Sequence, residues 1–210
     1  MIKVVNNKNF ILTIRKLKTM KALKSILAMA LILTASHLFG QTNYVLNKDY
    51  KLTINGGSNL HDWTENVEKA TANASVTWNN NGTFTLNGLT VIVYVQSIKS
   101  SEGGVMNGKT YKALKSDSHP TITFTLTSPL QISGGGTTVS ATGNLNIAGV
   151  TRGVTIRAKV NSIANNNISI EGVVPLRMSE FGIDPPNALF GALKVSNDIS
   201  IQFKTNLVKS

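Results

Sequence analysis

The sequence predicts an all-β domain, an antiparallel barrel of about eight strands with one short helix. From residue 44 onward, short runs of alternating apolar and polar residues are separated by turns rich in Asn and Gly. These runs follow one another through short connections, without an internal repeat or a linker. The chain has no cysteine, so the domain depends on a hydrophobic core instead of disulfides.

Residues 1–40 differ from the rest of the chain. They contain seven of the 21 Lys and Arg residues and no acid, and they include the apolar run Ile26–Leu33. A basic segment before a short apolar run is typical of a secretory signal peptide. We expect cleavage between Gly40 and Gln41, with Met20 as an alternative start, and a barrel domain over residues 41–210. A retained N-terminal anchor is the alternative, although the run is shorter than the roughly 20 residues of a membrane span.

Most of the net positive charge of the chain lies in residues 1–40, the predicted leader. The whole chain carries a net charge of +11, but residues 41–210 hold 14 basic residues against all ten acids, a net charge of +4. The remaining Lys and Arg are scattered singly and form no basic helix or patch. These features predict an exported protein without a nucleic-acid partner and, after signal removal, without a membrane span.

The first strands follow from the alternation directly. Tyr50, Leu52 and Ile54 share one face, and Phe84 and Leu86 share another after the turn signal 79–82. Residues 60–65 show no clean period and are interpreted as a strand end or a loop. The predicted strands are, in order, 50–54, 72–78, 83–86, 89–95, 121–127, the two arms of a hairpin over 143–160, 168–178 and 198–208.

The hairpin over residues 143–160 has the clearest pattern, with an apolar and a polar face on each arm. Gly149 and Gly153 bracket the predicted turn, which leaves Thr151 and Arg152 displayed at its tip.

One short helix is predicted near residues 108–115. Tyr111 and Leu114 lie three apart among lysines, and Pro120 ends the segment. We expect this helix to cap one end of the sheet.

Two architectures suit such a chain, a sandwich and an up-and-down barrel. Many consecutive hairpins favour closure, because a barrel removes exposed strand edges. A barrel of about eight strands is either filled by its own side chains or holds one small ligand. The mixture of large and small inward residues leaves both outcomes open.

Signs of enzymatic chemistry are few. His61 and His119 are the only histidines after the leader, and no metal-ligand spacing or nucleophile motif occurs. His61, Asp62 and Arg152 are candidates for polar groups at a barrel mouth that orient a ligand. The alternative is that these side chains only stabilise loops. We predict no catalytic residue, metal or cofactor.

Several motifs follow one another along the chain: Ser58–Trp63, Met106 with 111–115, His119–Phe124, Gly143–Arg152, Phe181–Pro186 and Val195–Phe203. In this order they resemble the YceI-like family. The resemblance implies an extended, lipocalin-like eight-stranded antiparallel barrel exported to the bacterial periplasm. It also implies a pore that holds a polyisoprenoid or other long-chain lipid, and a homodimer.

Two departures from the family pattern affect what the resemblance implies. Gly153 stands where the family often has proline, and the form Leu60–Trp63 is typical of a subgroup. The identity of the lipid is therefore not transferred.

These observations lead to the hypothesis of a binding protein that encloses one long-chain lipid. A packed structural or adhesive domain of the cell envelope is the main alternative, and a small hydrolase or isomerase acting inside the pore is a third. The polar rim is predicted at His61, Asp62 and Arg152. The predicted apolar pore residues are Phe84, Ile122, Phe124, Leu126, Leu145, Ile147, Ile156, Met178 and Phe203.

Overall fold

The computed structural model describes residues 40–79, 82–164, 167–188 and 193–210. The predicted signal peptide falls outside these residues and stays a prediction. Among the residues described, no helix is long and apolar enough to cross a membrane.

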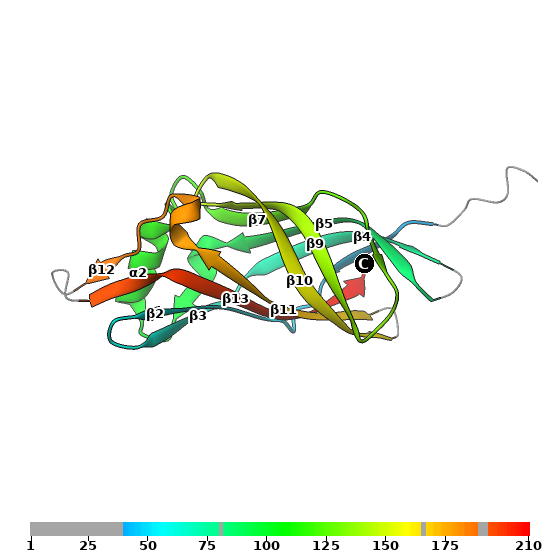
Figure 1. Cartoon of the computed structure of the whole chain (residues 1–210), viewed down its shortest axis with the longest axis horizontal. Helices are drawn as coiled ribbons and strands as arrows, with labels where there is room; N and C mark the ends of the chain where they lie inside the picture. The colour runs from blue at the N-terminus through cyan, green and yellow to red at the C-terminus, as the bar shows by residue number, and fades with distance from the viewer. Residues whose placement is uncertain (1–39, 80–81, 165–166, 189–192) are drawn as a thin grey trace, which may run out of the picture. The chain divides into compact units, whose positions relative to one another are not determined.

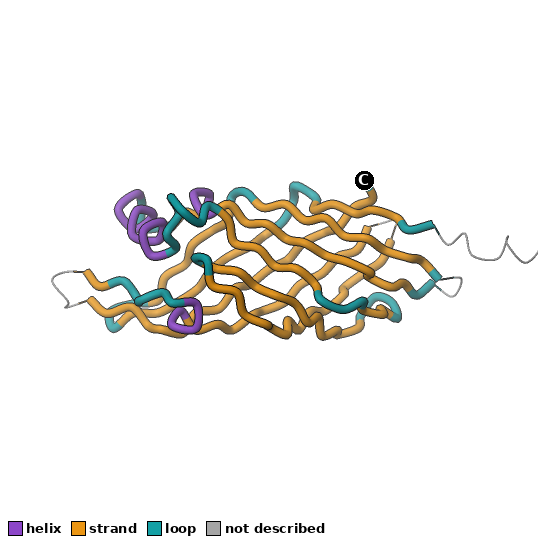
Figure 2. The backbone as a smooth tube through the Cα atoms, turned by 90° about the horizontal axis from the view of Figure 1, so that it is seen from above, coloured by secondary structure: helices purple, strands orange, loops and turns teal. Residues whose placement is uncertain are grey.

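The described residues form a closed antiparallel barrel of eight wall strands, which confirms the predicted fold (Figures 1 and 2). The helical segments are η2 (Val95–Ser97), α2 (Gly104–Ala113) and η3 (Met178–Phe181). The strands are β1 (Thr42–Leu46), β2 (Lys51–Ser58), β3 (Asp62–Val67), β4 (Ala70–Trp78), β5 (Phe84–Tyr94), β6 (Ile98–Ser100), β7 (Thr121–Leu126), β8 (Leu130–Ile132), β9 (Thr137–Ile147), β10 (Val150–Ala164), β11 (Asn167–Arg177), β12 (Asn187–Ala188) and β13 (Leu193–Lys209).

The long strand β13 closes the barrel. Its last residues pair with β1, its middle pairs with β2, and its other edge pairs with β11 over an eleven-residue register. Because β1 and β2 both pair with β13, they form a single bent wall strand. β3 and β4 form the next wall strand, since β3 pairs with β2 and β4 pairs with β1.

The turn between β9 and β10 lies earlier than the sequence predicts. Ala148 and Gly149 have φ values of 51° and 86°, and two positive values are what a two-residue type I′ hairpin turn requires. Thr151 and Arg152 are therefore strand residues, paired with Asn146 and Leu145. The prediction that they form the hairpin tip is wrong.

A bulge in β5 changes which of its residues face inward. Ser75 pairs with Gly88 and Val76 pairs with Leu86, so Asn87 has no partner across the ladder. One extra residue moves the inward face from Phe84 and Leu86 to the odd-numbered positions 89, 91 and 93.

Helix α2 begins four residues earlier than predicted, at Gly104, and ends two residues earlier, at Ala113. Gly103, at φ 92°, immediately precedes its first turn. The helix packs against β6, and in Figure 1 it lies at the same end of the barrel as the β2–β3 hairpin. We call this the mouth end. The opposite end, with the β4–β5 turn and the C-terminus, is the packed end.

Candidate functional site

The barrel contains an apolar cavity, the pore. Its empty space is about 1370 Å³, a figure that includes the part open to solvent. Among the described residues that line the pore, all are apolar except Tyr50 and Thr205, and none carries a charge. Such a wall can bind a long apolar chain through surface burial but offers little to a polar ligand.

Two phenylalanines in the pore wall lie over glycines. A Cβ atom at Gly143 would lie 2.5 Å from the Phe124 ring, and one at Gly172 would lie 2.6 Å from Cζ of Phe203. Both distances are shorter than real Cβ contacts. The glycines therefore let the rings lie close to the wall. Alanines at other lining positions, such as Ala72 and Ala141, also limit how far side chains extend into the pore.

The packed end is closed by an aromatic cluster. Tyr44 and Phe84 are each 1% exposed, and Trp78 lies between them with ring centroids 6.5 and 4.9 Å away. The Trp78 indole N–H donates a hydrogen bond of 3.0 Å to the Tyr44 hydroxyl. The one polar contact inside this cluster is thus satisfied, and none of the three residues lines the pore.

A second cavity, the mouth pocket, lies at the other end. It has about 800 Å³ of empty space, again including the part open to solvent, and it is lined by residues of α2, η3, β3 and β13, among others. Ile54, Ile122 and Ile201 line both this pocket and the pore. The two cavities therefore adjoin along shared side chains.

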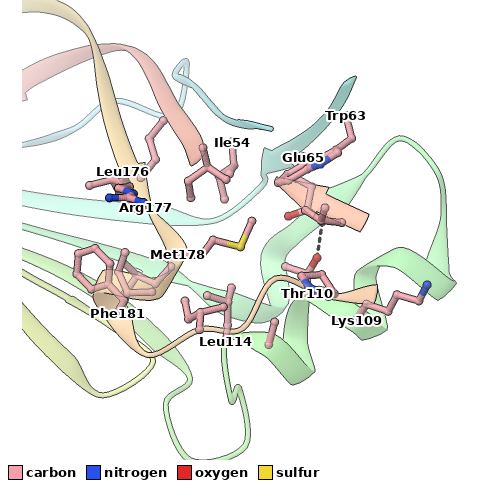
Figure 3. A pocket seen from close by; sticks show the side chains of 18 of the residues that line it. Ile54, Trp63, Glu65, Lys109, Thr110, Leu114, Leu176, Arg177, Met178 and Phe181 are labelled. Carbon is pink, nitrogen blue, oxygen red and sulfur yellow. Dashed lines mark hydrogen bonds between the residues drawn. The ribbon is translucent and has the colours of Figure 1, made fainter. Parts of the chain in front are cut away.

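Two residues of β3, Trp63 and Glu65, line the mouth pocket (Figure 3). Trp63 pairs with Gly56, where a Cβ atom would lie 2.2 Å from the indole, and its N–H donates to the Gly57 carbonyl at 3.2 Å. Two residues further along the strand, Glu65 faces the same side and is 4% exposed.

The Glu65 carboxylate accepts a hydrogen bond from the Thr110 hydroxyl of α2. Burial raises the pKa of the Glu65 carboxyl above its usual range, and the Thr110 hydrogen bond opposes this to a smaller extent. A carboxyl whose charge is poorly solvated thus lines the mouth pocket, which adjoins the pore.

Seven of the nine predicted pore residues line a cavity, and their role in binding stays a prediction. Phe84 and Leu126 line neither cavity and belong to the packed core. Ile147 and Met178 line only the mouth pocket. Of the nine predicted residues, those that line the pore itself are Ile122, Phe124, Leu145, Ile156 and Phe203.

The three predicted rim residues line neither cavity. His61 is exposed, with Nε2 2.5 Å from Oε1 of Glu102, and Asp62 is exposed at the start of β3. Nε of Arg152 donates a hydrogen bond of 2.9 Å to the Glu180 carbonyl of η3. These contacts fit the alternative in which such side chains stabilise loops.

The polar side chains that do line the mouth pocket are Glu65, Lys109, Thr110 and Arg177. Reading 63, 65 and 67 as one inward face would have identified Glu65 from the sequence. The acid between the apolar Trp63 and Val67 hides this alternation.

The YceI-like domain model matches residues 39–207. The chain belongs to the YceI-like family. No functionally curated protein matches this YceI-like chain.

Three solved structures resemble the YceI-like fold described here. BcnA of Burkholderia cenocepacia has a TM-score of 0.59 and 18% identity, over 75% of this chain and 95% of BcnA. A polyisoprenoid binding domain from Saccharophagus degradans has a TM-score of 0.58 and 11% identity, over 81% and 99%. The YceI protein of Campylobacter jejuni has a TM-score of 0.53 and 16% identity, over 70% and 84%. At these identities the likeness shows the fold.

Proposed function

We propose that the chain is an exported, non-enzymatic binding protein that encloses one polyisoprenoid or other long-chain lipid in its pore. The observation that carries this proposal is the apolar, uncharged pore that adjoins a mouth pocket. The polyisoprenoid binding named for the Saccharophagus degradans domain supports the ligand class.

The affinity in this proposal comes from burying the chain. Each methylene group removed from water contributes about 0.8 kcal/mol. Binding should therefore strengthen with chain length until the pore is filled, and the pore wall should discriminate little between chains of similar length.

The alternative of a packed structural domain needs a barrel filled by its own side chains. Many inward residues, among them Val91, Ile156 and Phe203, are only partly buried although they face the interior. Their remaining accessible surface borders the pore. This under-filled interior favours the binding protein.

Export to the periplasm belongs to the proposal as well. It is supported by the basic and apolar pattern of residues 1–40 and by the resemblance to the family. We also propose the homodimer that the resemblance implies, although the binding proposed here needs one copy of the barrel.

The test is to express the full chain in a Gram-negative host, purify the protein from the periplasm, and analyse an organic extract by mass spectrometry. We expect one long-chain lipid per protein, released only when the protein is denatured. Protein without lipid that also takes up no long-chain alcohol or hydrocarbon after purification would refute the proposal.

A further inference from the structure

Glu65 is a buried acid in the lining of the mouth pocket, which adjoins the pore. Its neighbours in the lining of the mouth pocket are mostly apolar, including Trp63, Met106, Leu114 and Met178. Figure 3 shows the Glu65 carboxylate and the Thr110 hydroxyl directed toward each other across this pocket. The pore residues that the structure describes carry no charge, and only Tyr50 and Thr205 among them have a polar side-chain group. A polar head leaving the pore therefore meets Glu65 in an otherwise largely apolar pocket.

The protein leaves much of the bonding capacity of Glu65 unused. An ionised carboxylate has about four acceptor sites. Within the described part of the chain, the Glu65 side chain has one hydrogen-bond partner, Thr110, and no ion pair. The remaining sites are available to a ligand in the pocket.

Two cations line the pocket without neutralising Glu65. In Figure 3 the Lys109 side chain extends away from Glu65, and Arg177 lies on the opposite side of the pocket. Nε of Arg177 lies 3.4 Å from Oδ1 of Asp198, and the Arg177 side chain is 63% exposed. An anionic head beside Glu65 would thus add a second negative charge without a cation between them.

We propose that Glu65 selects the head of the lipid, favouring a neutral hydroxyl head over the phosphate ester of the same chain. This inference rests on the proposed function. A hydroxyl donates to an ionised carboxylate and accepts from a protonated carboxyl, so it fits Glu65 in either state. A phosphate brings its own charge into an apolar pocket, and its desolvation is costly when no cation compensates it.

The raised pKa of Glu65 agrees with this geometry, because its main cause is burial, which penalises the charged carboxylate. A second anion at the same place would be disfavoured for the same reason.

The experiment is a competition followed by native mass spectrometry. Delipidated full-length barrel is incubated with equal amounts of geranylgeraniol, geranylgeranyl phosphate and the corresponding hydrocarbon, and the bound species are counted by mass. We expect wild-type protein to bind the alcohol about tenfold or more over the phosphate, since desolvating a charged group without a compensating partner costs at least about that factor.

Two variants assign the preference to Glu65. Glu65→Gln keeps a hydrogen-bonding side chain without a charge, so the alcohol should still bind while its advantage over the phosphate falls at least about threefold. Glu65→Leu should lose the preference for the alcohol over the hydrocarbon. Glu171→Gln makes the same change on the outer face of β11, beside Lys204 on β13, and should leave all ratios unchanged.

A preference for the phosphate in wild-type protein, or an alcohol-to-phosphate ratio that is the same in wild type and Glu65→Gln, would overturn the inference while leaving the proposed function intact. If none of the three compounds binds, including the hydrocarbon, the proposed function itself fails.

Discussion

The two ends of the barrel use the same alternating strands for opposite purposes. At the packed end, Tyr44, Trp78 and Phe84 fill the interior and satisfy their polar contact internally. At the mouth end, α2 and η3 cover a pocket in which Glu65 keeps unused bonding capacity. The difference shows that periodicity sets which face a residue occupies, while side-chain volume at each level decides whether the barrel is core or cavity.

The largest expected effect comes from filling the pore between these ends. Ala141→Phe adds a ring to the pore wall, whereas Thr142→Phe adds the same ring to the exposed outer face of β9. We expect Ala141→Phe to lower the lipid recovered per protein about tenfold or more, because losing two or more buried methylenes already costs that much affinity. Thr142→Phe should retain the wild-type content. Equal lipid content in both variants would show that the pore is not the binding site.

The packed end should carry more of the stability. Phe84→Ala removes a ring with complete packing and should lower the free energy of unfolding by about 3–5 kcal/mol. Phe203→Ala should cost less, because part of that ring already faces the pore. Urea denaturation of both delipidated variants measures the difference. A larger loss for Phe203→Ala would contradict the division into a packed end and a cavity.

Removing one hydroxyl at the mouth end should lower the free energy of unfolding. Thr110→Val removes the hydrogen bond to the buried Glu65 carboxylate with little change in shape, and should cost about 1–3 kcal/mol in chemical denaturation at pH 7. The control, Thr125→Val on the exposed face of β7, should stay within about 0.5 kcal/mol of wild type. Similar values for both variants would mean that Glu65 is solvated after all.

The smallest expected effect is a pH dependence specific to Glu65. Its folded pKa lies above the unfolded value of about 4.3, so the folded protein binds more protons and wild type loses stability as pH rises through this interval. Glu65→Gln lacks this loss. The stability of Glu65→Gln relative to wild type should therefore increase with pH above about 4.3 and level off above the folded pKa. A stability difference between Glu65→Gln and wild type that stays constant from about pH 4 to 8 would contradict a raised pKa for Glu65.

The alternation in the sequence was sufficient to predict the closed barrel and the inward positions of residues such as Phe124 and Ile156, because the period of two is fixed by strand geometry. It could not give the level of each residue along the barrel. Phe84 and Leu126 face inward as predicted, yet they lie in packed core where no cavity remains.

The position of the β9–β10 turn was predicted wrongly and Glu65 was missed, each for a physical reason. Gly153 suggested a turn, but it pairs with Asn144 in the β9–β10 ladder, and Ala148 takes the positive φ that the turn requires. Glu65 was missed because a buried acid interrupts the apolar pattern of its own strand. A break in an otherwise regular inward face is therefore a sequence signal for a position that merits testing as a functional one.

The most direct test of the lipid-binding account is a native mass spectrum of wild-type protein purified from the periplasm, recorded before and after organic extraction. The account predicts a mass above that of the processed polypeptide by one long-chain lipid, which disappears on extraction and is restored by adding geranylgeraniol. A spectrum that shows the polypeptide alone before extraction and after addition of the alcohol would contradict it.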